Sequence, residues 1–115
     1  MLERHDLKKL IEVGKKQQEV DLHGCKVQVR LLTVGEDIDA MKSCVGLDPF
    51  SREKELKVQI LARAIMINGQ PFPDLEEGCN FFREVQEPIL ISFAELYNSL
   101  RQLQLIELSN VQREK

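Results

Sequence analysis

Apolar and polar residues alternate with a period of two between residues 19 and 31, a pattern typical of half-buried β-strands. His23 and Gly24 interrupt the alternation at its middle, and Gly24 supplies the positive φ that a two-residue turn requires. This turn pairs apolar residues on one face and opposite charges on the other: Val20 with Val27, Leu22 with Cys25, and Asp21 with Lys26. The pattern therefore predicts a β-hairpin over residues 19–31.

The rest of the chain follows the three-and-four spacing of amphipathic helices. A first short stripe consists of Leu7, Leu10, Ile11 and Gly14, with Asp6 as the expected N-cap. After the hairpin, the first three helix starts carry capping signals, namely a Thr33–Glu36 capping box, Asp48-Pro49 and Asp74. The predicted helices after the hairpin cover residues 33–46, 49–67, 75–86 and 88–109.

The inward faces of these helices follow from the same spacing. In helix 33–46 we expect Ile38, Met41 and Val45 to face the core, and Gly46 to end the helix. The second half of helix 49–67 is apolar nearly all round, which indicates the central helix, and Asn68-Gly69 is interpreted as its end. Leu75, Cys79, Phe82 and Val85 are expected to form the inner stripe of helix 75–86. The last helix carries an apolar stripe at alternating spacings of four and three, formed by Ile89, Phe93, Leu96, Leu100 and Leu103. Pro88 either kinks one long helix or separates two.

These elements predict an α+β fold that is mostly helical, with an N-terminal β-hairpin packed on four to five helices. A length of 115 residues, 43% of them apolar and 30% charged, suits one globular domain with its own core. We therefore expect residues 1–115 to form a single domain that needs neither disulfides nor metal.

Charge and cysteine content limit the partners and the cellular compartment that this protein can have. The formal net charge of −3 and the scattered Lys and Arg residues argue against a nucleic-acid partner. The three cysteines are odd in number and widely spaced, which favours free thiols in a reducing compartment. The charged N-terminus lacks the pattern of a signal peptide, and no run approaches the ~18 apolar residues of a membrane span. We expect a protein made and folded in a cytosol, with no membrane partner.

Candidate catalytic chemistry is sparse. His23 and Cys25 are the one conceivable base–nucleophile or ligand pair, but the hairpin register turns Cys25 toward the apolar face, which favours a small buried residue. No second Cys or His pair completes a zinc site, and the six glycines are isolated rather than grouped in a phosphate loop. The acidic residues near Glu36 and Glu76 are explained by helix capping. We therefore expect no enzyme activity, no metal and no cofactor.

The C-terminal helix carries more apolar residues than one face of a small domain readily buries. The candidate partner-binding residues are Leu96, Tyr97, Leu100, Leu103, Leu105, Ile106 and Leu108. Two interpretations remain open, a stripe that packs on the central helix and hairpin, or a surface for a partner or a second copy of the chain. The excess near Leu105 to Leu108 is the part that most favours a partner.

The order of these elements resembles a known family. A hairpin over residues 19–31 runs directly into Leu32-Thr33-Val34-Gly35-Glu36, and a later helical segment reads LARAIMINGQPF over residues 61–72. This is similar to the tail assembly chaperones and baseplate hub assembly proteins of tailed bacteriophages. The resemblance covers roughly residues 18 to 108 and rests on pattern rather than on a specific motif.

The resemblance implies a non-enzymatic protein that binds other phage tail proteins, namely the tape-measure, tube or hub protein, in the host cytoplasm during assembly. One alternative is a permanent structural subunit of the virion tail, baseplate or neck. Another, from the composition, is a small regulatory binding protein. The residues do not define which partner is bound, whether the protein stays in the mature particle, or its oligomeric state, and a homo-oligomer is compatible with the apolar stripe.

Overall fold

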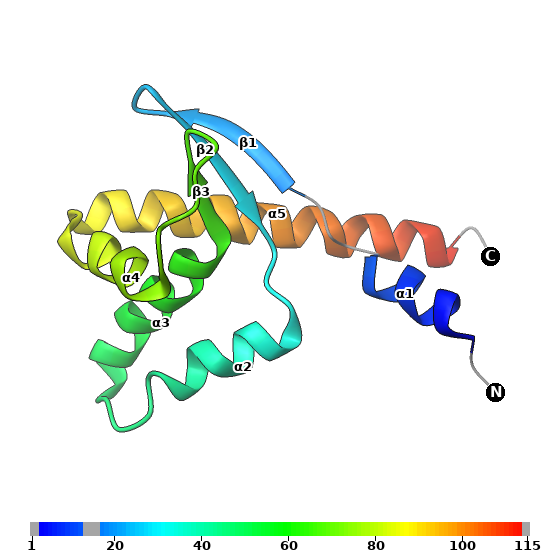
Figure 1. The fold of residues 1–115 in the computed structure, drawn as a ribbon, viewed down its shortest axis with the longest axis horizontal. Helices are drawn as coiled ribbons and strands as arrows, with labels where there is room; N and C mark the ends of the chain where they lie inside the picture. Colours follow the sequence, from blue (N-terminus) through cyan, green and yellow to red (C-terminus); the bar gives the residue numbers. More distant parts are fainter. Residues whose placement is uncertain (1–2, 13–16, 114–115) are drawn as a thin grey trace.

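The β-hairpin has the predicted register in the computed structural model, which describes residues 3–12 and 17–113 (Figure 1). Strand β1, Gln17–Leu22, pairs antiparallel with β2, Cys25–Arg30, and Asp21 lies opposite Lys26. His23 and Gly24 have φ values of 51° and 83°, so both central turn residues are left-handed, as in the type I′ turn that suits a two-residue hairpin. The sequence prediction of this hairpin is confirmed.

A third strand, β3 at Ile65–Ile67, was not predicted. Helix α3, Pro49–Ala64, ends three residues before the expected boundary, and the chain passes directly into β3. Strand β3 pairs antiparallel with β2, which gives a three-stranded sheet of order β1-β2-β3. Asn68 and Gly69 then turn the chain with φ values of 52° and 77°. The Asn-Gly pair is a hairpin turn here, and its interpretation as a helix end was wrong.

The other helix boundaries differ from the predictions by a few residues. Helix α2 is Val34–Lys42, α4 is Leu75–Glu84 and α5 is Glu87–Arg113. Because α4 ends before α5 begins, Pro88 separates two helices, and it occupies the first turn of α5, where a missing N–H costs no hydrogen bond.

The first helix, α1, spans Arg4–Glu12 and begins earlier than expected. Asp6 therefore lies in its first turn and is not the N-cap. Gly14, which was assigned to the same stripe, lies outside the described residues.

The three capping signals predicted after the hairpin are confirmed. The Thr33 hydroxyl accepts a hydrogen bond from the Glu36 backbone N–H at 3.2 Å, and the Glu36 carboxylate accepts one from the Thr33 N–H at 3.0 Å. Asp48 caps α3 with Pro49 at its first position, and Asp74 accepts from the Glu77 N–H at 2.8 Å. Side-chain acceptors satisfy backbone donors that a helix start leaves unpaired, so these positions define where the helices begin.

The core forms where β2, the second half of α3, α4 and the first half of α5 meet. Val27, Val29 and Leu61 are at most 1% exposed, and Phe82 packs edge-to-face on Phe93 at a centroid distance of 5.3 Å. The second half of α3 is thus central, as predicted. The result is an α+β fold that is mostly helical, in which the long helix α5 runs beside the sheet and extends beyond it (Figure 1).

Four residues expected to face inward are exposed. Ile38, Met41 and Val45 are 46%, 61% and 79% exposed, whereas Ala40 and Cys44 are the buried residues of this segment. Helix α2 contacts α3, and it buries the small Ala40, as the turn after it buries Cys44, while its large apolar side chains are exposed. Leu75, at the start of α4, is also 42% exposed.

Candidate interaction surfaces

The first half of α5 belongs to the core. Tyr97 and Leu100 are 8% and 4% exposed, and Leu96 is partly buried against the same cluster. The Tyr97 hydroxyl accepts a hydrogen bond from the Leu32 backbone N–H at 3.2 Å, and burial raises the pKa of Tyr97. Of the seven candidate partner-binding residues, Tyr97 and Leu100 are therefore packed inside the protein, and Leu96 is partly covered at the edge of the core.

The second half of α5 is exposed. Leu103, Leu105, Ile106 and Leu108 are between 41% and 55% exposed. Gln104 is the last buried residue of α5 among the side chains described, which extend to residue 110. Beyond it, α5 presents apolar side chains on several sides without cover. We call Leu103, Leu105, Ile106 and Leu108 the α5 end surface.

Two shallow hollows flank this surface. One, of about 290 Å³, is lined by Leu105, Ile106, Ser109 and Asn110. The other, of about 530 Å³, runs along the helix and is lined by Glu95, Asn98, Ser99, Gln102, Leu103 and Ile106. Ile106 lines both, and Glu107 is the one charged residue between positions 102 and 110. An apolar surface with little charge and with hollows beside it suits a protein partner.

A second apolar surface lies on α1. Leu7, Leu10 and Ile11 are 43%, 70% and 62% exposed, and α1 buries none of its residues. Helix α1 lies at the end of the long axis of the molecule where α5 also ends (Figure 1). The spacing of these residues predicts an apolar stripe, but it does not indicate that the fold leaves the stripe exposed.

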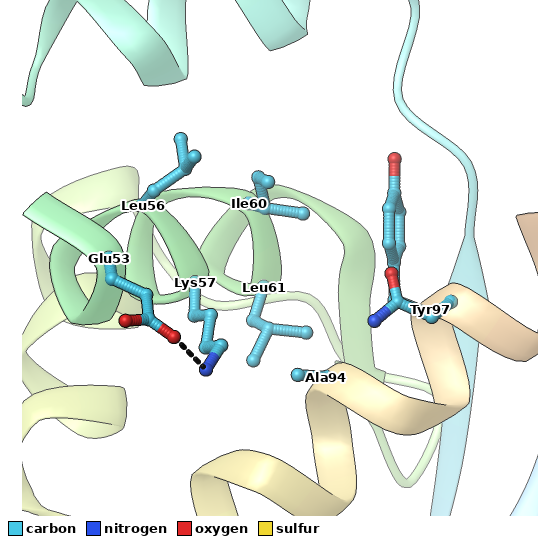
Figure 2. A pocket seen from close by; sticks show the side chains of 8 residues that line it. Glu53, Leu56, Lys57, Ile60, Leu61, Ala94 and Tyr97 are labelled. Atoms are coloured by element: carbon cyan, nitrogen blue, oxygen red, sulfur yellow. Dashed lines mark ion pairs between the residues drawn. The ribbon is translucent and has the colours of Figure 1, made fainter.

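The third apolar surface involves α2 and α3. Leu56 and Ile60 of α3 border a pocket of about 220 Å³ against Ala94 and Tyr97 of α5 (Figure 2). Its rim carries the ion pair between Lys57 Nζ and Glu53 Oε1, 3.6 Å apart. Leu56 also borders a neighbouring hollow of about 270 Å³ with Met41, Cys44, Val45, Gly46 and Arg52. Sequence reasoning missed these hollows because each forms only where two helices meet.

An ion pair fixes α2 to the sheet. Arg30 donates from both terminal guanidinium nitrogens to Glu36, at 2.9 and 2.7 Å, and one of these nitrogens also donates to the Arg63 carbonyl at 3.0 Å. The hydrogen bonds from Arg30 lower the pKa of Glu36 to about 2. This network joins β2, α2 and the end of α3, so it fixes the position of α2 relative to the sheet.

The residues considered for catalysis are not assembled into a site in the described part of the chain. His23 is exposed in the hairpin turn, and Cys25 is half-buried with a free thiol. Burial raises the pKa of the Cys44 and Cys79 thiols. Within residues 3–12 and 17–113, no three His, Cys, Asp or Glu side chains lie close enough to hold a metal ion. None of the described helices has the length and apolar character to cross a membrane.

The fold and the surfaces together define the class of this protein. It is a small, mostly helical α+β protein whose distinctive features are exposed apolar helix faces. Comparisons with protein-family models, with curated proteins and with solved structures found no match to this chain.

Proposed function

We propose that this protein assists the assembly of a bacteriophage tail or baseplate by binding another tail protein, without enzymatic activity. The observation that carries the proposal is the α5 end surface, because a helix that extends past its own core with four exposed Leu and Ile side chains offers an apolar anchor. The order of hairpin, capped helix and further helices, which resembles tail assembly chaperones and baseplate hub assembly proteins, suggests the kind of partner. That partner is the tape-measure, tube or hub protein encoded with it, bound in the host cytoplasm.

Binding to these proteins tests the proposal directly. The purified chain is mixed with each of the three proteins from its own genome, and complexes are detected by size-exclusion chromatography. A Leu105→Asp/Ile106→Asp variant should lose binding at least about tenfold, since buried charge in an apolar contact is costly. Leu75→Asp is the matched control, because Leu75 is similarly exposed on another helix and its variant should bind normally. Binding of none of the three partners by the parent protein would overturn the proposal.

Mass spectrometry of mature particles separates two roles for the same surface. A chaperone acts during assembly and should be abundant in infected cells but absent from particles. Presence at a fixed stoichiometry in particles would assign a permanent place in the tail, baseplate or neck instead.

A further inference from the structure

Helix α1 has an apolar face that the other described residues leave largely exposed. It is nine residues long, and helices shorter than roughly 12 residues are marginal in water unless an apolar face is packed. Its apolar face, formed by Leu7, Leu10 and Ile11 and called here the α1 stripe, buries nothing. A docking site for this stripe would supply the missing stabilisation.

Helix α2 presents an apolar face of matching size. Val34, Ile38 and Met41 lie on one side of this nine-residue helix, at 77%, 46% and 61% exposure, and Val45 continues the line in the following turn. We call these four residues the α2 face. Its far end opens into the 270 Å³ hollow beside Leu56, which extends the apolar area onto α3. Surface residues this large and contiguous commonly mark a protein contact.

Charges beside the two stripes match in one orientation only. With 100° per residue, Arg4 and Lys8 lie on one side of the α1 stripe and Asp6 on the other. On α2, Asp37 lies on one side of the α2 face and Lys42 on the other. When two helices pack in parallel, the opposite flanks of their stripes meet, as g and e positions do in a parallel coiled coil. Parallel packing therefore places Lys8 toward Asp37 and Asp6 toward Lys42, whereas antiparallel packing sets like charges together.

We propose that α1 of one copy of this chain docks in parallel on the α2 face of a second copy, which docks its own α1 in return. A second copy is the occupant because α1 stands apart from α2 of its own chain (Figure 1). The exchange is isologous, so each dimer contains two identical contacts related by a two-fold axis. It uses residues other than the α5 end surface and does not depend on the proposed function.

A complementation experiment tests the exchange on the full-length protein. Sedimentation equilibrium should show the parent chain as a dimer, and Leu10→Asp/Ile11→Asp and Ile38→Asp/Met41→Asp variants as monomers. All four side chains are exposed, so circular dichroism melts should show both variants folded. Mixing the two variants should restore a weaker heterodimer, since one intact α1 then meets one intact α2 face. Leu105→Asp/Ile106→Asp is the control that should dimerise like the parent.

Charge reversal tests the orientation. Lys8→Glu should weaken the dimer by roughly tenfold at low salt, because two exposed ion pairs per dimer are replaced by repulsion. Adding Asp37→Lys to that variant should recover most of the loss, and Asp37→Lys alone should weaken the dimer like Lys8→Glu. A double variant weaker than either single variant would overturn parallel packing.

Other outcomes would overturn the exchange itself. The parent chain could be a monomer at every concentration tested while limited proteolysis fails to cleave α1. That result would mean that α1 packs on its own chain. Dimers that survive both pairs of aspartate substitutions would place the interface elsewhere. A mixture that contains only monomers would show that α1 and the α2 face do not meet.

Discussion

Arg30 and Glu36 show how one charged pair positions an entire helix. The pair is bidentate, and Glu36 also closes the capping box of α2, so a single carboxylate links the sheet to the start of this helix. Hydrogen bonding to Arg30 lowers the pKa of Glu36 to about 2, below that of an unfolded glutamate. The folded state therefore holds fewer protons than the unfolded state between these two pKa values. The contribution of this pair to stability is complete above the unfolded pKa and is lost as the pH falls toward 2.

Glu36→Gln should lower the free energy of unfolding by about 1 kcal/mol at neutral pH, a modest value because both side chains are partly exposed to solvent. The difference from the parent should shrink as the pH is lowered from about 5 toward 2, since Glu36 of the unfolded parent then takes up a proton that the folded state does not bind until near pH 2. Urea unfolding at several pH values measures this. Glu19→Gln, exposed on β1, is the control and should change stability little. A deficit that stays constant down to the lowest pH would contradict the assignment.

At the scale of elements, the short strand β3 is held by its turn. The Asn68 side-chain oxygen accepts a hydrogen bond from the Lys26 N–H at 2.9 Å, and the Asn68 N–H donates to the Lys26 carbonyl at 2.7 Å. Gly69 has a φ of +77° in this turn, with open space around the position of a Cβ atom. Backbone conformation, rather than packing, thus requires glycine here.

Gly69→Ala should therefore destabilise the fold by about 1 kcal/mol, the cost of a left-handed conformation for an alanine. Gly35→Ala is a matched control, since Gly35 lies in α2 with an ordinary φ and no contact closer than 3.9 Å. That change should be neutral or slightly stabilising, because alanine favours helix. Urea denaturation of both variants measures the contrast, and equal effects would argue against the turn geometry.

At the scale of the molecule, apolar residues divide between a core and uncovered surfaces. The core spans β2, β3, α3, α4 and the first half of α5, whereas the exposed apolar side chains gather on α1, α2 and the α5 end surface. The molecule measures 47 × 36 × 27 Å, and α5 contributes much of its length (Figure 1). Polar substitutions should therefore destabilise this protein far less at the exposed apolar residues of α1, α2 and the α5 end surface than at its core residues.

The same substitution at two sites tests this division. Ile65→Asp, at 2% exposure, should cost about 4 kcal/mol or more and remove cooperative unfolding, because it buries an unpaired charge. Leu105→Asp, at 51% exposure, should change stability by less than about 0.5 kcal/mol. Thermal melts followed by circular dichroism distinguish the two. A cooperative loss of helix in the Leu105 variant would move that residue into the core.

Much of the fold was predictable from local sequence. The hairpin register and the caps at Thr33, Asp48 and Asp74 follow from neighbouring residues, whose interactions do not depend on the rest of the chain. The candidate site was predictable only in part. Leu103, Leu105, Ile106 and Leu108 lie on the surface, but Tyr97 and Leu100 could not be separated from them by spacing alone.

The errors arose where a distant partner decided the outcome. The local sequence of Ile65–Ile67 is compatible with the end of a helix. These residues form a strand because they pair with the edge of β2, and this pairing outweighs local helix propensity. Likewise, Ile38 and Met41 have the spacing of a core stripe, but the residues that this segment buries are Ala40 in α2 and Cys44 in the turn after it.

The sequence by itself determined most elements of this protein, the starts of α2, α3 and α4 and the pairing of its hairpin, because turns, caps and alternation are set by residues a few positions apart. Only the tertiary structure decided that Ile65–Ile67 is a strand and which apolar stripes are buried. A stripe shows that a helix has a face to cover, and the packing of the whole chain determines whether that face meets its own core or is left for another protein.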